Sequence, residues 1–278
     1  MENIKIHRRL IDLDNIQIFY RDTETHKDPI LCLHGRWGRG ETWVDFINNY
    51  GKRFRIVAPD QRGHGLSSKP ESEYSGDEMT NDMIHLLDHL GIKSAIVIGH
   101  SMGGYIAGYM AAMYPQYVKA LAILDKSASG PKAQGKPKLN QMDLIDPVTR
   151  DWPMPFTSLK EAQDYIRNEM ESELSYQYFM NSLVETIDGY QMMFSTQAIA
   201  SNIAQYKDWY DLLPRIQCPT MILRAKHGDA VSDDDFARMK SMIINCMDYE
   251  IDTTDHNVHL ADKEAFYKCM DDFLKKIG

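Results

Sequence analysis

The sequence lacks long hydrophobic runs, strings of basic residues and closely spaced cysteines, and each absence excludes a class of protein. Nowhere do about 18 apolar residues follow one another, which excludes a membrane-spanning helix. No long block of Lys and Arg occurs and the net charge is −9, which argues against nucleic acid or an anionic membrane surface as a partner. The four cysteines have neither the CxxC spacing of a zinc site nor the density of a disulfide framework. Residues 1–9 have no apolar stretch typical of a signal peptide, so we expect a cytoplasmic protein.

The chain has enough apolar residues to bury a large core, because they make up 43% of its 278 residues. Short continuous apolar runs are typical of strands covered on both faces, and the amphipathic stretches between them indicate crossover helices. With an antiparallel hairpin at the start, these runs predict an α/β fold with a doubly wound, mostly parallel eight-stranded sheet. The predicted strands are 4–11, 16–20, 29–33, 54–58, 95–98, 120–124, 220–223 and 247–251, and the predicted helices are 41–50, 77–90, 102–114, 232–242 and 261–276.

One segment, 126–207, breaks the alternation of strands and helices. It contains no buried-strand run; a stretch rich in Gly, Pro and Lys, 129–138, leads into helical patterns rich in Met, Phe and Tyr. We expect an inserted helical cap here, on a core domain formed by 1–125 and 208–278. The apolar faces of the cap could close over the sheet, or they could form only the cap's own core.

A serine stands between two glycines where the predicted strand 95–98 ends, in Gly99-His100-Ser101-Met102-Gly103. A strand, a sharp turn and a helix in this order form the arrangement that exposes a nucleophilic serine at the apex of the turn. Glycine spares such a turn its steric clashes. We therefore predict Ser101 as a nucleophile, which requires a histidine base oriented by a carboxylate.

Two further loops are placed to supply these groups. The segments 224–231 and 253–260 follow the late strands and contain Asp229 and His256. Because the loops that follow parallel strands lie at the same edge of a sheet, these side chains are expected to meet Ser101 there.

The chain resembles the α/β-hydrolase superfamily of serine hydrolases, of the carboxylesterase and lactonase type with a helical lid. Besides the serine motif, the family's early His-Gly loop occurs as 34–38 and its Asp-x-Arg-Gly-x-Gly-x-Ser loop as 60–67. The resemblance implies the triad Ser101, Asp229 and His256, in that chain order. It also implies that the backbone N–H groups of Arg36 and Met102 form the oxyanion hole.

Some assignments have competitors. His259 lies three residues after His256, and Asp125 lies at the end of the strand that follows Ser101, where some relatives carry the acid. We favour His256 and Asp229, because both follow late strands in the family's usual way. His85 and His89 stand four apart on a helix, but no third ligand is evident, so we expect no metal.

These features predict a serine hydrolase that cleaves carboxylic esters or lactones of a small, largely apolar substrate, without a cofactor and without a nucleic-acid or membrane partner. Hydrolysis of thioesters or carbon–carbon bonds and a slow ligand-sensing role are the alternatives. Arg36 and Arg39 could engage a substrate carboxylate or carbonyl, or could point into solvent. The oligomeric state is open. The residues predicted to contact the substrate are Trp37, Trp152, Phe156, Phe179 and Met192.

Overall fold

The computed structural model describes residues 4–13, 15–130, 146, 148–205 and 207–278. Its centre is an eight-stranded sheet in the order β1-β2-β4-β3-β5-β6-β9-β10. β1 pairs with β2 and β2 with β4 in antiparallel fashion, and the other neighbours are parallel. The strands are β1 His7–Leu13, β2 Ile16–Asp22, β3 Pro29–Leu33, β4 Arg55–Pro59, β5 Ala95–His100, β6 Val118–Leu124, β9 Thr220–Ala225 and β10 Cys246–Ile251. The predicted α/β fold and sheet are confirmed.

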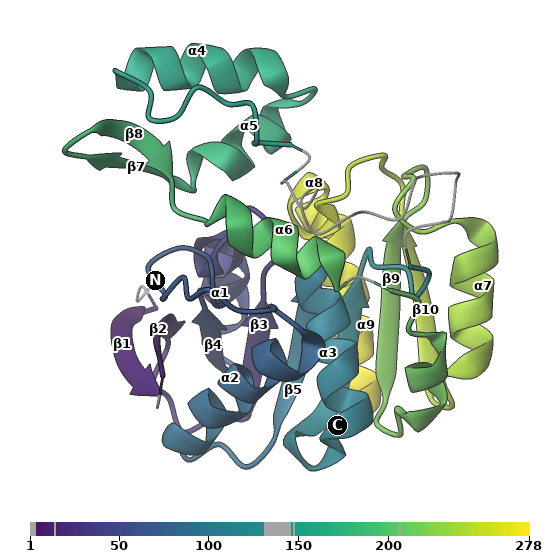
Figure 1. Ribbon diagram of the computed structural model, residues 1–278. Coiled ribbons are helices and arrows are strands. Elements are labelled where there is room, and N and C mark those ends of the chain that lie inside the picture. The colour runs from purple at the N-terminus through teal and green to yellow at the C-terminus, as the bar shows by residue number, and fades with distance from the viewer. Residues whose placement is uncertain (1–3, 14, 131–145, 147, 206) are drawn as a thin grey trace.

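Helices cover both faces of the sheet (Figure 1). One apolar cluster packs α2, α3 and α7 on one face, and a second packs α1 and α9 on the other. Because helices cover both faces, the central strands are buried throughout, as their continuous apolar runs predict. The helical elements of the core are η1 Gly40–Trp43, α1 Val44–Tyr50, α2 Gly76–His89, α3 Met102–Met113, η2 Pro115–Tyr117, η4 Tyr210–Arg215, α7 Asp233–Met242, α8 Val258–Ala261 and α9 Lys263–Ile277.

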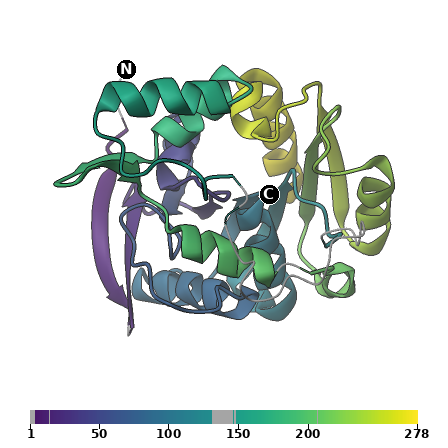
Figure 2. The ribbon, with the colours of Figure 1, turned by 45° about the horizontal axis from the view of Figure 1, so that its top comes forward.

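A separate group of elements lies between β6 and η4 in the chain and above the carboxyl edge of the sheet (Figure 1). We call its described part, 148–205, the cap. Figure 2, in which this side comes forward, shows α4 and α6 at opposite sides of the cap. Its elements are α4 Leu159–Glu169, α5 Glu173–Met180, β7 Leu183–Thr186, β8 Gly189–Met192 and α6 Thr196–Ala204.

The cap contains a two-stranded hairpin, β7–β8, that the helical prediction did not include. Its strands are short and half-exposed, so they lack the continuous apolar runs by which the strands of the main sheet were recognised. The pair Asp188-Gly189, where the turn enters β8, is a signal that could have found it, because an Asp-Gly pair favours tight hairpin turns.

Candidate active site

Ser101 lies in a strained turn between β5 and α3. Its backbone has φ 53° and ψ −117°, a conformation that an L-residue with a side chain rarely adopts. Position 99 admits only glycine, because a Cβ there would lie 2.0 Å from the carbonyl oxygen of Gly103. The glycine therefore makes the turn possible. The sharp turn leaves Ser101 partly exposed although both flanking elements are buried. This is the geometry that the Gly-x-Ser-x-Gly sequence predicts.

The carboxylate partner of His256 is Asp125. The Nδ1–H of His256 donates to Asp125 Oδ2 at 2.7 Å, and Asp125 is 1% exposed. Its other oxygen accepts the backbone N–H of Ala225 at 2.9 Å, which fixes the carboxylate. With the proton on Nδ1, the Nε2 of His256 is free to act as a base.

The prediction of Asp229 as this partner is wrong. Asp229 is exposed in the loop after β9, whereas Asp125 directly follows β6, the strand next to β5. Leu124 and His100 are partners in the parallel pairing of β6 with β5, so Asp125 and Ser101 follow adjacent positions at the same edge. The buried acid is therefore one strand away from the nucleophile.

Ser101 and His256 line the same cavity, of about 250 Å³. Across the described residues, no hydrogen bond joins the Ser101 hydroxyl directly to the imidazole of His256. In unliganded active sites the contact between nucleophile and base is often long and tightens when substrate binds. The arrangement thus places a serine and an oriented histidine at one cavity, and the carboxylate that holds the histidine is buried beneath them.

Two buried histidines, His100 and His259, lie next to the loop that contains His256. The Nε2–H of His100 donates to the backbone carbonyl of His256 at 2.8 Å, and the ring of His259 stacks on Trp43 at 4.7 Å. Burial lowers the pKa of His259 to about 3, with the nearby His256 adding to this shift. Burial likewise lowers the pKa of His100 well below its ordinary value. Both rings are therefore neutral at pH 7.

His259 does not open onto the cavity. Both of its ring nitrogens are buried and make no hydrogen bond to the described residues. The choice of His256 over His259 thus agrees with the geometry, since His256 has both the carboxylate partner and access to the cavity.

The loop that follows β3 packs directly on the turn that holds Ser101. A Cβ on Gly35 would lie 2.8 Å from His100 Nδ1 and 3.1 Å from Ser101 Cβ. Arg36 follows Gly35, and Met102 is the first residue of α3, where a backbone N–H has no acceptor within its own helix. The two residues predicted for the oxyanion hole therefore lie on the two segments that meet at Ser101.

Comparison with known proteins identifies the family. A profile described as the alpha/beta hydrolase fold matches residues 28–263. The chain is an α/β-hydrolase. It is 26% identical to the human serine hydrolase BPHL over 95% of this chain and 85% of the human protein. It is 25% identical to the zebrafish (Danio rerio) sn-1-specific diacylglycerol lipase ABHD11 over 87% of this chain and 76% of that protein.

Solved structures agree with this α/β-hydrolase in fold. The E-2-(acetamidomethylene)succinate hydrolase superposes with a TM-score of 0.83 at 21% identity, covering 98% of this chain and all of that one. The enol-lactonase from Burkholderia xenovorans LB400 superposes with a TM-score of 0.75 at 20% identity, covering 96% of this chain and all of that one. At this identity the likeness concerns the fold alone.

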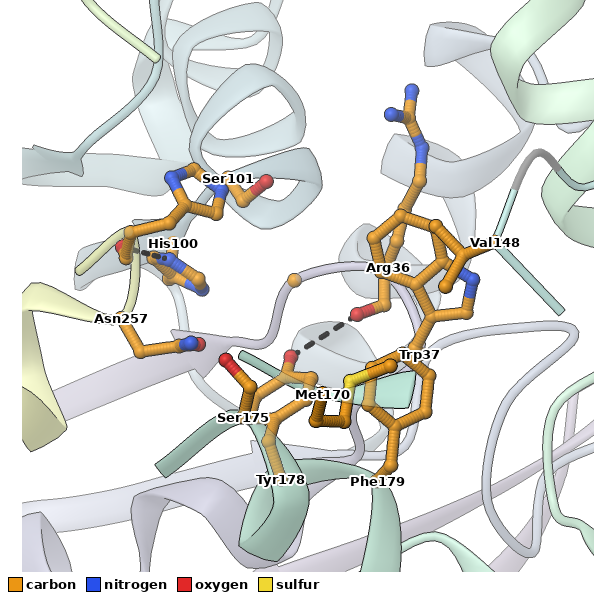
Figure 3. Close-up of a pocket in the computed structure, with 12 residues that line it drawn as sticks. Arg36, Trp37, His100, Ser101, Val148, Met170, Ser175, Tyr178, Phe179 and Asn257 are labelled. Atoms are coloured by element: carbon orange, nitrogen blue, oxygen red, sulfur yellow. Dashed lines mark hydrogen bonds between the residues drawn. The ribbon is translucent and has the colours of Figure 1, made fainter. Parts of the chain in front are cut away.

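The cavity of this α/β-hydrolase is mostly apolar on the side opposite Ser101. Figure 3 shows Trp37, Val148, Met170 and Phe179 gathered there, across from Ser101 and His100. Sequence reasoning had named Trp37 and Phe179. It missed Val148, Met170, Ser175, Tyr178 and Asn257, which also line the cavity.

Three residues predicted to contact the substrate belong elsewhere. Trp152, Phe156 and Met192 are at most 6% exposed and pack together in an apolar cluster within the cap. They do not line the cavity at Ser101. Trp152 and Phe156 precede α4 and Met192 ends β8, and all three serve the cap's own core, which is the alternative that an apolar pattern always leaves open.

The side chains of Arg36 and Arg39, in the loop after β3, both make hydrogen bonds to other parts of the chain. Arg36 Nε donates to Asn202 Oδ1 at 3.0 Å, and Arg39 Nε donates to the backbone carbonyl of Asn181 at 2.5 Å. Both acceptors belong to the cap, so these side chains connect the core with the cap. In Figure 3 the guanidinium of Arg36 points away from Tyr178 and Phe179.

The described part of the chain lacks two other kinds of feature. No group of three or more His, Cys, Asp or Glu side chains there could hold a metal ion. No helix within those residues has the length and hydropathy needed to span a membrane.

Proposed function

We propose that this α/β-hydrolase cleaves carboxylic esters or lactones of small, largely apolar substrates through an acyl-enzyme on Ser101. The observation that carries the proposal is the pairing of buried Asp125 with His256, at the cavity onto which the strained Ser101 opens. A hydrogen bond from Nδ1 to a carboxylate orients the imidazole and stabilises its protonated form. The similar curated proteins, a serine hydrolase and a diacylglycerol lipase, support the same reaction class.

The reaction follows from these positions. His256 Nε2 takes the proton of the Ser101 hydroxyl as the oxygen attacks the substrate carbonyl carbon. The backbone N–H groups of Arg36 and Met102 bind the resulting oxyanion, and the N-terminus of α3 favours negative charge there. The protonated His256 then gives its proton to the departing alkoxide, which leaves as the alcohol, and a water molecule repeats the sequence to release the acid.

The cavity favours a small acyl group. Its volume of about 250 Å³ lies below the range of about 300–1,000 Å³ typical of sites for drug-sized ligands. Apolar side chains face Ser101, so an aliphatic or aryl acyl group fits better than a charged one.

The test combines active-site labelling with turnover. We expect a fluorophosphonate probe to label the wild type and short-chain p-nitrophenyl esters to be hydrolysed, while Ser101→Ala loses both. Ser241→Ala, which changes an exposed serine on α7, is the matched control and is expected to retain both. A wild type that is neither labelled nor active would overturn the proposal. Labelling without turnover of esters, lactones or thioesters would replace it by the ligand-sensing alternative.

A further inference from the structure

The loop that would supply the oxyanion N–H is held by two different parts of the molecule. Side chains of the core hold its beginning: His34 Nδ1–H donates to the Gly35 carbonyl at 2.8 Å. The side chain of Gln61 donates to the His34 carbonyl at 2.7 Å, and the Gln61 backbone N–H donates to His34 Nε2 at 2.9 Å. These three hydrogen bonds hold His34 and Gly35 and do not extend to the residues that follow.

The next two residues are held from the cap. The Tyr178 hydroxyl donates to the backbone carbonyl of Arg36 at 3.2 Å, the bond drawn between them in Figure 3. The Ser182 hydroxyl donates to the backbone carbonyl of Trp37 at 2.7 Å. Asn202 on α6 accepts from the Arg36 side chain, as described above. Residues of α5, of the turn after α5 and of α6 thus converge on two consecutive residues of the loop.

The loop conformation needs such support. Trp37 has φ 62°, a backbone conformation that is unfavourable for a bulky residue and persists only where surrounding contacts impose it. Its indole N–H donates to Asp146, which is completely buried. A Cβ on Gly38 would lie 2.1 Å from the Tyr178 hydroxyl, so the tyrosine fills the space that this glycine leaves.

The cap groups are also chemically suited to a permanent contact. Tyr178 and Ser182 are 6% and 1% exposed, so water does not compete freely for the two carbonyls. Burial raises the pKa of Tyr178, which keeps the phenol protonated and able to donate.

From this division of contacts we infer that Tyr178 and Ser182 are positioning residues for the oxyanion hole. By fixing the carbonyls of Arg36 and Trp37, they restrict the backbone on the carboxyl side of the Arg36 N–H, which must point at the developing oxyanion. The inference rests on the proposed function, which gives the Arg36 N–H its role. It means that the cap acts on the chemical step, in addition to shaping the cavity.

The test uses Tyr178→Phe and Ser182→Ala, singly and together, with Tyr176→Phe as the matched control. Tyr176 lies on the same helix and is equally buried, but Arg167 of α4 lies over its ring, and across the described residues no hydrogen bond joins its hydroxyl to the loop. Deleting an oxyanion donor lowers kcat by about 10²–10³. Because these variants loosen the donor without deleting it, we expect kcat to fall about tenfold in each single variant and further in the double variant. KM for a short-chain ester is expected to change less than threefold, and Tyr176→Phe is expected to match the wild type.

Two further readouts separate positioning from a general loss of structure. The inhibition constant of an alkyl boronic acid, which mimics the tetrahedral state, should rise in proportion to the loss of kcat/KM. Backbone hydrogen exchange at 36–38 should be faster in the double variant than in Tyr176→Phe, a comparison that needs no turnover. If the wild type is inactive but exchange rises, the proposed function fails while the attachment of the loop to the cap stands. If kcat and exchange of the double variant equal those of the control, the inference is overturned.

Discussion

Replacing Asp125 by asparagine should nearly abolish catalysis, whereas the same change at Asp229 should not. In Asp125→Asn the amide oxygen can still accept the Ala225 N–H, which leaves the NH₂ group facing His256 Nδ1. Two donors then oppose each other, so the imidazole is driven to carry its proton on Nε2, the nitrogen that must act as the base. The buried charge that would stabilise the imidazolium is also lost.

The size of the expected loss of activity follows from the placement of the imidazole proton on the wrong nitrogen. In serine hydrolases of another fold, a carboxylate-to-amide change that leaves the geometry intact lowers kcat about 10⁴-fold. The hydrogen bond between His256 and Asp125 is short, at 2.7 Å, and its carboxylate is 1% exposed, so we expect a loss of kcat of similar size here. We expect kcat to fall about 10³- to 10⁴-fold, equivalent to about 4–5.5 kcal/mol of transition-state stabilisation.

The assay compares kcat/KM for p-nitrophenyl butyrate in Asp125→Asn, Asp229→Asn and the wild type, with thermal melting as the check on folding. Asp229 is exposed, and we expect its variant to stay within twofold of the wild type. A melting temperature near that of the wild type assigns the loss in Asp125→Asn to chemistry. The reasoning is refuted if Asp229→Asn loses more than a hundredfold while Asp125→Asn keeps a third or more of the activity.

Three other predictions concern the glycine turn, the buried histidines and the cavity. Gly103→Ala should lower the free energy of unfolding by about 1–3 kcal/mol, because its Cβ would lie 2.4 Å from the Leu33 carbonyl oxygen. Gly104→Ala should be milder in the same urea titration, because its Cβ would approach no closer than 3.0 Å to the Lys126 side chain and 3.1 Å to the Gly99 carbonyl oxygen. His259 takes up a proton near pH 6.5 when the chain is unfolded but only near pH 3 when it is folded, so the free energy of unfolding falls as the pH drops below 6.5. His259→Phe should reduce the dependence of this free energy on pH by about 1.4 kcal/mol per pH unit between pH 6 and 4. A dependence equal to that of the wild type would contradict a neutral, buried His259. Phe179→Ala enlarges the cavity and should raise the ratio of kcat/KM for hexanoate over butyrate p-nitrophenyl esters about tenfold, whereas an unchanged ratio would place the acyl group elsewhere.

The parts of the fold that the sequence predicts well are those in which local pattern and burial agree. The central strands are continuous apolar runs because both faces are covered, and the turn at Ser101 is recognisable because only glycine fits on each side of it. The cap is harder to read from sequence. Phe156 and Phe179 belong to the same buried apolar cluster, but only Phe179 also lines the cavity, and nothing in their sequence pattern distinguishes them.

Polar cavity residues such as Tyr178 and Asn257 were missed for a related reason. Tyr178 reaches the site through the packing of α5 on the loop after β3, a contact between segments about 140 residues apart. Such a contact leaves almost no trace in local periodicity. The glycine at 38 was the available signal, since the side chain it lacks would collide with Tyr178.

The choice between Asp125 and Asp229 depends on the order of strands in the sheet, which chain order alone does not give. Both residues follow a strand that ends at the same edge, so a motif written along the chain admits either one. β6, however, pairs directly with β5, and the backbone N–H of Asp125 continues the ladder by donating to the Leu223 carbonyl of β9 at 2.7 Å. Asp125 is therefore fixed by three adjacent strands before its side chain makes any contact. Asp229 lies four residues beyond the end of β9, past the last hydrogen bonds that join this loop to β10 and the segment after it, and across the described residues no backbone hydrogen bond to a strand holds it. A carboxylate that must hold an imidazole within hydrogen-bonding distance benefits from the first environment, because its orientation is then determined by the sheet itself.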